Sequence, residues 1–180
     1  MELFMYVIAG IIGVCILGIV VMMVFAKLRG NANVQVITKE LTGLKLLSID
    51  ENKALFTMHI PIKNLGSQES AVVDAFARPF LPQEQFKDAV AYAYLENSEA
   101  RRNDNYFEAV LIPAGVKKDL IITLEFVARN NKNIKEVLSD MVDMDIAIYV
   151  DGSARKGLYV HKGYITIMGE EIKLLVGGKN

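Results

Sequence analysis

The residues that could support metal chemistry are few, and their spacing does not favour it. The two histidines, His59 and His161, do not form a His-x-x-x-His pattern, which would place two imidazoles on one face of a helix. Asp140, Asp143 and Asp145 form an acidic cluster that lacks the ligand spacing and the glycine of a calcium loop. We therefore predict no metal site and no cofactor site, and we expect His59 on the surface of a strand.

Nucleophilic catalysis is also poorly supported. Ser48, Ser67 and Ser153 lack the flanking glycines of a nucleophile elbow and have no evident base. The sequence predicts no catalytic residue and a chain that is not an enzyme.

One loop-like segment resembles a ligand motif. Asp151-Gly152-Ser153 with Gly157 resembles the Asp-x-Ser-x-x-Gly loop of PilZ barrels, which bind cyclic dinucleotides together with upstream arginines. Gly157 stands one position late, and Arg101-Arg102 lacks the Arg-x-x-x-Arg spacing. A PilZ-like module is therefore a remote alternative, and we predict an ordinary strand turn at 151–153.

The chain is organised around an uncharged apolar stretch at residues 3–26. A helix of this length spans about 36 Å, against roughly 30 Å for the hydrocarbon core of a bilayer. We predict a transmembrane anchor at residues 1–29, which is retained because the start carries Glu2 and the apolar run exceeds that of a signal peptide. Cys15, the one cysteine, lies within it, so the rest of the chain can form no internal disulfide.

The flanks and one face of this helix suggest its orientation and its contacts. Lys27 and Arg29 follow the span and no basic residue precedes it, which favours a cytoplasmic domain, with the opposite orientation left open. Ala9, Gly10 and Gly13 share one arc of the helix. Small residues let a second helix approach closely, so we predict a helix–helix contact there, although glycine is common in membrane spans in general.

The balance of basic and acidic residues argues against one class of binding partner. The chain has 20 basic and 21 acidic residues and a net charge of -1, which gives no electrostatic footprint for nucleic acid. We predict the lipid bilayer as one partner, and a protein or a second copy of the chain as another.

The remainder predicts a linker at residues 30–33 and one domain at 34–180, which is large enough for its own core. Period-two alternation predicts strands at 55–62, 71–77, 87–95, 106–112, 120–126, 144–150, 157–160, 164–168 and 172–176, with one or two more at 34–50. We expect 87–95 and 106–112 to form a hairpin with a long tip. Pro61 should lie near an edge or a bulge, and Pro79 and Pro82 should end the strand at 71–77.

Two finer expectations concern faces and the helix. Val72 and Phe76 should share one face of their strand, opposite Val73 and Ala75. A short helix is predicted near 134–141, where Ile134, Val137, Leu138 and Met141 follow helical spacing, with Asn133 and Glu136 as its capping box. The resulting fold class is mainly β: an antiparallel immunoglobulin-like β-sandwich with one short helix, preceded by a single transmembrane helix.

Three segments carry a family resemblance. Ile62-Lys63-Asn64-Leu65-Gly66, Ile112-Pro113-Ala114-Gly115, and the helix at 133–142 leading into 145–150 resemble the late-embryogenesis-abundant type of β-sandwich, the water-stress and hypersensitive-response (WHy) domain, over roughly 36–167. Leu65 replaces the family's proline, and the stretch between 95 and 106 is a long insertion. The resemblance implies a non-enzymatic binding or structural domain.

Two functional hypotheses follow from the sequence. In the first, the sandwich is a non-catalytic protein-interaction or accessory subunit of a membrane complex. In the second, it holds an apolar ligand such as a lipid between its sheets, because Met and Phe are frequent in the predicted core.

Overall fold

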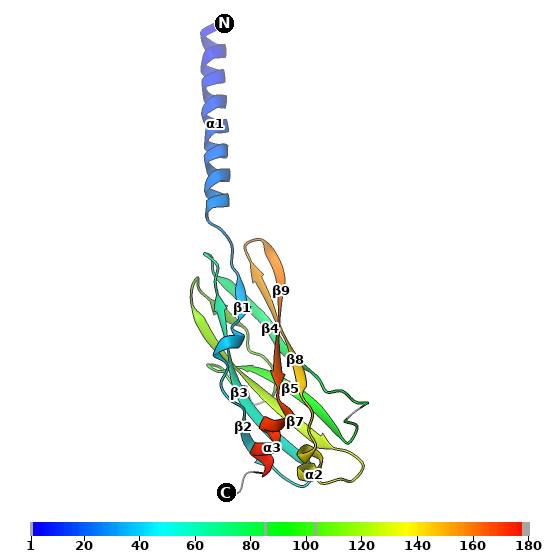
Figure 1. Ribbon diagram of the computed structural model, residues 1–180. Helices are drawn as coiled ribbons and strands as arrows, with labels where there is room; N and C mark the ends of the chain where they lie inside the picture. The colour runs from blue at the N-terminus through cyan, green and yellow to red at the C-terminus, as the bar shows by residue number, and fades with distance from the viewer. Residues whose placement is uncertain (1, 85, 103, 178–180) are drawn as a thin grey trace.

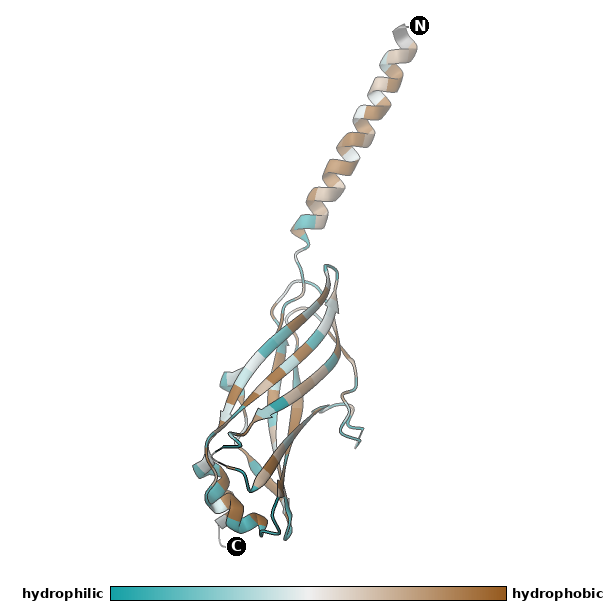
Figure 2. Cartoon of the chain, turned by 90° about the vertical axis from the view of Figure 1, so that its right-hand side faces the viewer, coloured by the Kyte–Doolittle hydropathy of each residue, from teal (hydrophilic) through white to brown (hydrophobic). Residues whose placement is uncertain are grey.

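The computed structural model describes residues 2–84, 86–102 and 104–177. Helix α1 (Glu2–Leu28) projects from one end of an elongated β-sandwich, and the last described residues, up to Gly177, lie at the opposite end (Figure 1). By length and composition α1 could cross a bilayer, and none of its span is buried against the sandwich. Figure 2 shows apolar residues along almost the whole helix and hydrophilic residues at its C-terminal end.

The sandwich consists of two antiparallel sheets. The first has the order β1-β3-β7-β5, with β2 also paired to β3, and the second has the order β6-β4-β8-β9. The strands are β1 (Val34–Val36), β2 (Lys45–Ile49), β3 (Lys53–Asn64), β4 (Ser70–Phe80), β5 (Ala89–Asn97), β6 (Val110–Ile112), β7 (Lys117–Ala128), β8 (Met144–Ala154) and β9 (Gly157–Ile167).

Strand order identifies the architecture. If β1, β3, β4, β5, β7, β8 and β9 are lettered A to G, the two sheets read A-B-E-D and C-F-G, which is the order of a constant-type immunoglobulin domain. The predicted antiparallel immunoglobulin-like sandwich is therefore confirmed, with β2 and β6 as additions to it.

The core lies between the sheets and follows the period-two pattern of β3 and β7. Fully buried side chains on these strands are Phe56, Ile60, Ile62, Leu120, Ile122, Leu124 and Phe126. The rings of Phe56 and Phe126 meet edge to face, with centroids 5.7 Å apart and planes at 87°, an arrangement that aromatic pairs favour. The sequence pattern predicted these inward faces correctly.

The helices at the end of the sandwich away from α1 agree only in part with the sequence. Helix α2 (Ile134–Ser139) is confirmed, and the side chain of Asn133 caps it by accepting a hydrogen bond from the Lys135 amide. The strand predicted at 172–176 is wrong, because this segment belongs to helix α3 (Gly169–Gly177). Ile172, Leu175 and Val176 pack on the core at helical i, i+3, i+4 spacing.

The predicted hairpin of residues 87–95 with 106–112 is also wrong. Strand β5 pairs with β7 in one sheet, whereas β6 pairs with β4 in the other. The chain between them crosses from sheet to sheet, and no local turn signal distinguishes such a crossing from a hairpin tip. Residues 34–50 do form two short strands, with a 3-10 turn at Thr38–Glu40 between them.

The turn predicted at Asp151-Gly152-Ser153 is wrong, since all three residues lie within β8. A side-chain carbon on Gly152 would collide with the ring of Tyr159, so this glycine serves a close approach between β8 and β9 and does not mark a turn. The chain reverses after Ala154. The two strands predicted at 157–160 and 164–168 are parts of one strand, β9, which ends at Ile167.

Pro61 lies on β3 opposite Asp119 of β7, and on its other side the pairing with β1 ends at Ile62. Its carbonyl accepts a hydrogen bond of 2.8 Å from the Ile37 amide, but proline has no N–H to donate in return. The Ile37 carbonyl instead accepts from the Glu40 amide at 3.2 Å. The β1–β3 ladder therefore ends next to Pro61, and the 3-10 turn at Thr38–Glu40 follows β1 at this point.

A β-bulge in β4 reverses the predicted faces. The register shifts between Val72 and Asp74, so Val73 turns outward and Val72 and Ala75 are both buried. Phe76 is exposed as a result, opposite to the prediction. Pro79 lies inside β4 and does not end the strand as predicted. Proline is tolerated there because β6 pairs only with residues 70–72, so that side of β4 has no strand neighbour at Pro79 within the described ranges.

The sandwich should fold without α1. Every residue of the hydrophobic core comes from position 34 or later, so the helix contributes no burial to it. A fragment of residues 30–180 is expected to show a single cooperative urea transition with a stability of roughly 5 to 15 kcal/mol, followed by circular dichroism of its strands. A gradual loss of signal without a transition would show that the helix, or a partner bound through it, is part of the fold.

Candidate functional site

The outer face of the β6-β4-β8-β9 sheet presents aromatic side chains to solvent. Phe76 on β4 and Tyr149 on β8 are register partners, and their rings stack with centroids 4.7 Å apart and planes at 11°. Lys162 on β9 is the next partner in this row. Its ammonium lies 5.0 Å from the ring centroid of Tyr149 and 4.7 Å from that of Tyr164. We call Phe76, Tyr149, Lys162 and Tyr164 the aromatic face.

This face is open to solvent and carries one cation, Lys162. Phe76 is 39% exposed and Tyr164 is 56% exposed. Hydrogen bonding with Tyr164, and to a lesser extent with Tyr149, raises the pKa of Lys162 above its ordinary value. The ammonium is therefore charged at neutral pH. Among the residues that the structure describes, no carboxylate forms an ion pair with Lys162 or with the exposed Arg78, which lies two residues from Phe76 on β4. The face therefore combines flat apolar rings with a cation available to a carboxylate.

Sequence reasoning missed the aromatic face for two reasons. The bulge in β4 reversed the expected orientation of Phe76, and Lys162 fell between two segments predicted as separate strands. The missed signal was the continuous alternation of Val160, Lys162 and Tyr164 along one face of β9.

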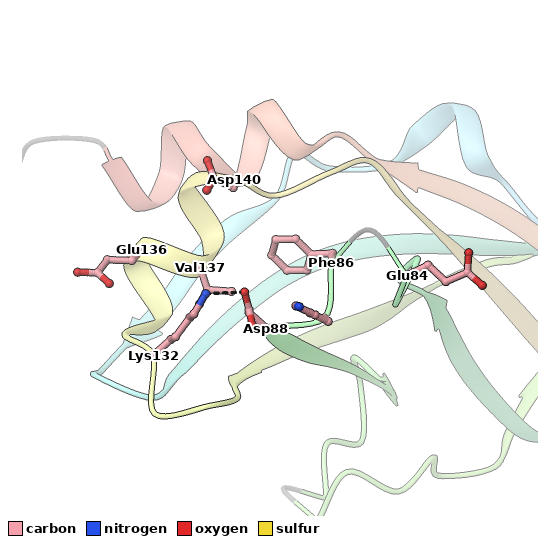
Figure 3. A pocket seen from close by; sticks show the side chains of 8 residues that line it. Glu84, Phe86, Asp88, Lys132, Glu136, Val137 and Asp140 are labelled. Carbon is pink, nitrogen blue, oxygen red and sulfur yellow. Dashed lines mark hydrogen bonds and ion pairs between the residues drawn. The ribbon is translucent and has the colours of Figure 1, made fainter.

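A hollow of about 430 Å³ lies at the end of the sandwich away from α1, and Figure 3 shows the side chains that line it. Lys132 closes one side of it through an ion pair of 2.7 Å with Asp88, and this pair lowers the pKa of Asp88. Figure 3 shows Glu136 and Glu84 pointing away from each other. The polar groups of this hollow do not converge on one point, so it does not resemble a catalytic or ligand site.

The acidic cluster has structural roles. Asp140 is the C-terminal cap residue of α2. Asp143 accepts a hydrogen bond of 2.8 Å from the Gly169 amide, and Asp145 accepts one of 2.6 Å from the Thr166 hydroxyl. Within residues 2–84, 86–102 and 104–177, no three His, Cys, Asp or Glu side chains gather where they could hold a metal ion.

The remaining sequence candidates are not brought together. His59 is exposed, as predicted, and lies in the first sheet, whereas His161 is half-buried in the second, where burial lowers its pKa. Arg101 pairs with Glu96, and Arg102 pairs with Asp104 and Glu108. Neither arginine contacts the segment at 151–153, so the PilZ-like arrangement is absent from the described residues.

Two further sets of sequence candidates are not assembled into a site. The three serines lie on different elements: Ser48 on β2, Ser67 in the turn after β3, and Ser153 on β8. Ala9, Gly10 and Gly13 are exposed on α1, and their contact with another helix stays a prediction.

Glu96 forms a buried ion pair that is open to test. Its side chain is 2% exposed, and Oε2 accepts from the Arg101 guanidinium at 2.9 Å, while Oε1 has no partner among the described residues. Arg101→Ala would leave a buried carboxylate unpaired. We expect a loss of about 2 to 3 kcal/mol, below the full cost of breaking a buried pair because the Arg101 side chain is 46% exposed. Urea unfolding of fragment 30–180 measures it.

Two matched variants accompany this prediction. Glu96→Gln removes the charge itself and should cost less than Arg101→Ala. Arg102→Ala removes a neighbouring arginine whose ion pairs are exposed, and it should leave the urea midpoint almost unchanged. Equal effects of Arg101→Ala and Arg102→Ala would contradict the assignment.

The two turn segments quoted for the family resemblance meet at Asn64, which is fully buried. Its side-chain amide donates to the carbonyls of Gln68 and Ile112 at 2.7 and 2.9 Å. Its side-chain oxygen accepts from the amides of Asn33 and Gly66, both at 3.0 Å. Asn64 thus uses all of its side-chain hydrogen-bonding capacity to join three chain segments at the α1 end of the sandwich.

The fold defines this chain as an immunoglobulin-like β-sandwich preceded by an apolar helix. No protein-family model and no curated protein matches the sequence. Among solved structures, the chain is similar to the structural-genomics target SoR45, with 11% identity, a TM-score of 0.43, and coverage of 75% of this chain and 85% of that one. It is also similar to a protein described as ApaA from Bordetella pertussis, with 8% identity, a TM-score of 0.42, and coverage of 76% and 94%.

A third similar structure is the GAE domain of GGA2p from Saccharomyces cerevisiae, with 9% identity, a TM-score of 0.33, and coverage of 71% and 99%. At these TM-scores the likenesses carry no information about function. The site must therefore be interpreted from its own geometry.

Proposed function

We propose that this chain is a membrane-anchored, non-catalytic docking subunit, in which α1 holds the sandwich at the bilayer and the aromatic face binds a partner protein. The stack of Phe76 on Tyr149 under the Lys162 ammonium carries the proposal. Exposed aromatic rings beside a cation are the residue types that anchor protein interfaces. The resemblance to WHy domains supports the same non-enzymatic role.

The charge of the face indicates the chemistry of the partner. Lys162 and Arg78 form no ion pair within the described ranges, and the rings of Phe76 and Tyr149 offer flat apolar area. A segment with a carboxylate flanked by apolar side chains fits this arrangement, because both features would be satisfied at once.

The first test uses soluble peptides in which aspartate alternates with leucine, against peptides with lysine at the same positions. Nuclear magnetic resonance of fragment 30–180 should show shifts at Tyr149 and Tyr164 with the acidic peptide only. Lys162→Glu should abolish these shifts, whereas Lys45→Glu, at an exposed position on β2, should not. Equal binding of both peptides would refute a role for the cations.

The second test concerns assembly. The full chain released from its native membrane in a mild detergent should have a mass above that of one copy, and Lys162→Glu should lower it. A lone monomer for both proteins would contradict the docking role.

The side of the membrane is a separate inference. Lys27 and Arg29 flank the C-terminal end of α1, which favours a cytoplasmic sandwich. Protease added to intact cells should then leave the sandwich uncut, and digestion from outside would reverse the assignment.

The alternative of a lipid held between the sheets gains no support from the cavities. Those described lie at α2, beside the linker and at the end of α1, and Phe56 packs on Phe126 between the sheets.

A further inference from the structure

The junction between α1 and the sandwich is fixed by hydrogen bonds. The carbonyl of Arg29 accepts from the Ser67 hydroxyl at 2.9 Å and from the Gln68 side-chain amide at 2.8 Å. The Ser67 amide donates to the Asn31 carbonyl at 3.0 Å, and the Leu65 amide donates to Asn33 at 2.8 Å. The predicted linker at residues 30–33 therefore lies against the turn after β3.

Figure 1 shows the turn between β8 and β9 at the same end of the sandwich as α1. The Arg155 guanidinium donates to the carbonyl of Ala26, one of the last carbonyls of the helix, which have no partner within it. Residues Met22, Phe25 and Arg29 lie around this contact. If α1 crosses a bilayer as far as Leu28, this turn would lie at the depth where the hydrocarbon core gives way to headgroups.

We define the proximal end as residues 27–34, 64–70, 111–117 and 154–158, which the contacts above and those of Asn64 hold together. It contains five basic residues and one acidic residue, Glu69. Lys117 pairs with Glu40. The other four are Lys27, Arg29, Arg155 and Lys156, and none of them forms an ion pair within the described part of the chain.

Exposed apolar side chains accompany these charges, in or beside three separate turns. They are Leu65 at 51%, Leu111 at 58%, Val116 at 36% and Leu158 at 85% exposed. Basic residues beside exposed apolar side chains are the composition of surfaces that bind the membrane interface.

We propose that the proximal end is a second membrane-binding surface, on which Arg155 and Lys156 bind anionic lipid headgroups and Leu158 enters the interface. The inference rests on the proposed role of α1 as an anchor, because the tether sets the distance of this end from the bilayer. It adds a fixed orientation of the sandwich relative to the membrane, which anchoring alone does not require.

The chain contains no tryptophan, so single tryptophans introduced into the full-length protein are specific probes of membrane depth. Three variants are reconstituted in vesicles of phosphatidylcholine and phosphatidylglycerol with brominated acyl chains, which quench nearby indole fluorescence. Leu158→Trp reports on the proximal end and Phe25→Trp reports on α1. Leu174→Trp reports on the far end, where the parent leucine is 74% exposed.

The expected result is strong quenching of Phe25→Trp, quenching of Leu158→Trp by roughly twofold or more, and none of Leu174→Trp. Adding Lys156→Glu, or omitting phosphatidylglycerol, should reduce the quenching of Leu158→Trp without changing that of Phe25→Trp. If Leu158→Trp matches Leu174→Trp while Phe25→Trp is quenched, the proximal-end proposal is overturned and the anchor stands. If Phe25→Trp is not quenched, the anchor itself is overturned.

Discussion

Asn64→Leu will destabilise the sandwich by about 3 to 5 kcal/mol, because each buried backbone group left without a partner costs about 1 to 3 kcal/mol. The substitution removes both donors and both acceptor contacts of a fully buried side chain. The carbonyls of Gln68 and Ile112 lose their donor, and the amides of Asn33 and Gly66 lose their acceptor. The shift of the urea midpoint of fragment 30–180 measures the loss.

Two variants separate this effect from the general cost of substitution. Asn33→Ala changes an exposed asparagine on the same hydrogen-bonded segment but keeps the Asn33 amide, so it should cost under about 0.5 kcal/mol. Asn64→Asp keeps the shape but places an oxygen against two carbonyls, and it should be at least as harmful as Asn64→Leu. Similar midpoints for Asn33→Ala and Asn64→Leu would show that Asn64 does not join these turns.

Phe126→Ala will cost about 3 to 5 kcal/mol, the range for removing a large buried aromatic side chain. Phe126 is fully buried in the middle of the first sheet and supplies one ring of the edge-to-face pair with Phe56. The cavity left between the sheets would have no water or side chain to fill it. Urea unfolding of fragment 30–180 gives the free-energy difference.

Phe80→Ala is the matched control, because Phe80 is 45% exposed at the end of β4. It should cost about 1 kcal/mol or less. If the two phenylalanine substitutions cost the same, the inward face of β7 is wrongly assigned.

The sequence predicted the inward faces of β3 and β7 because each lies in regular strand geometry, where burial repeats every second residue. It could not predict the orientation of Phe76, since a single extra residue at Val73 shifts the register, and nothing in the local composition marks the bulge. The helix at Gly169–Gly177 was missed for a related reason. Four apolar residues over a short segment suit a strand as well as a helix, and packing on α2 decides between them.

The candidate site was less predictable than the fold. The aromatic face draws Phe76, Tyr149 and Lys162 from three strands, so its members meet only through sheet pairing. Asn64 stood in a quoted turn, but its role depends on Gln68, which is close in sequence, and on Asn33 and Ile112, which are both distant. Residues that act through such non-local contacts leave no periodic signal in the chain.

The hydrogen-bonded connection between α1 and the sandwich has a mechanical consequence. A flexible linker would let the sandwich rotate independently of α1. The contacts of Arg29, Asn31 and Ala26 with the turns beside them oppose such rotation, so that the helix and the sandwich rotate together. If a second helix packs against Ala9 and Gly13 and turns α1 about its own axis, the sandwich must turn with it. The direction in which the aromatic face points, parallel to the membrane plane, would then be determined by helix–helix packing inside the bilayer.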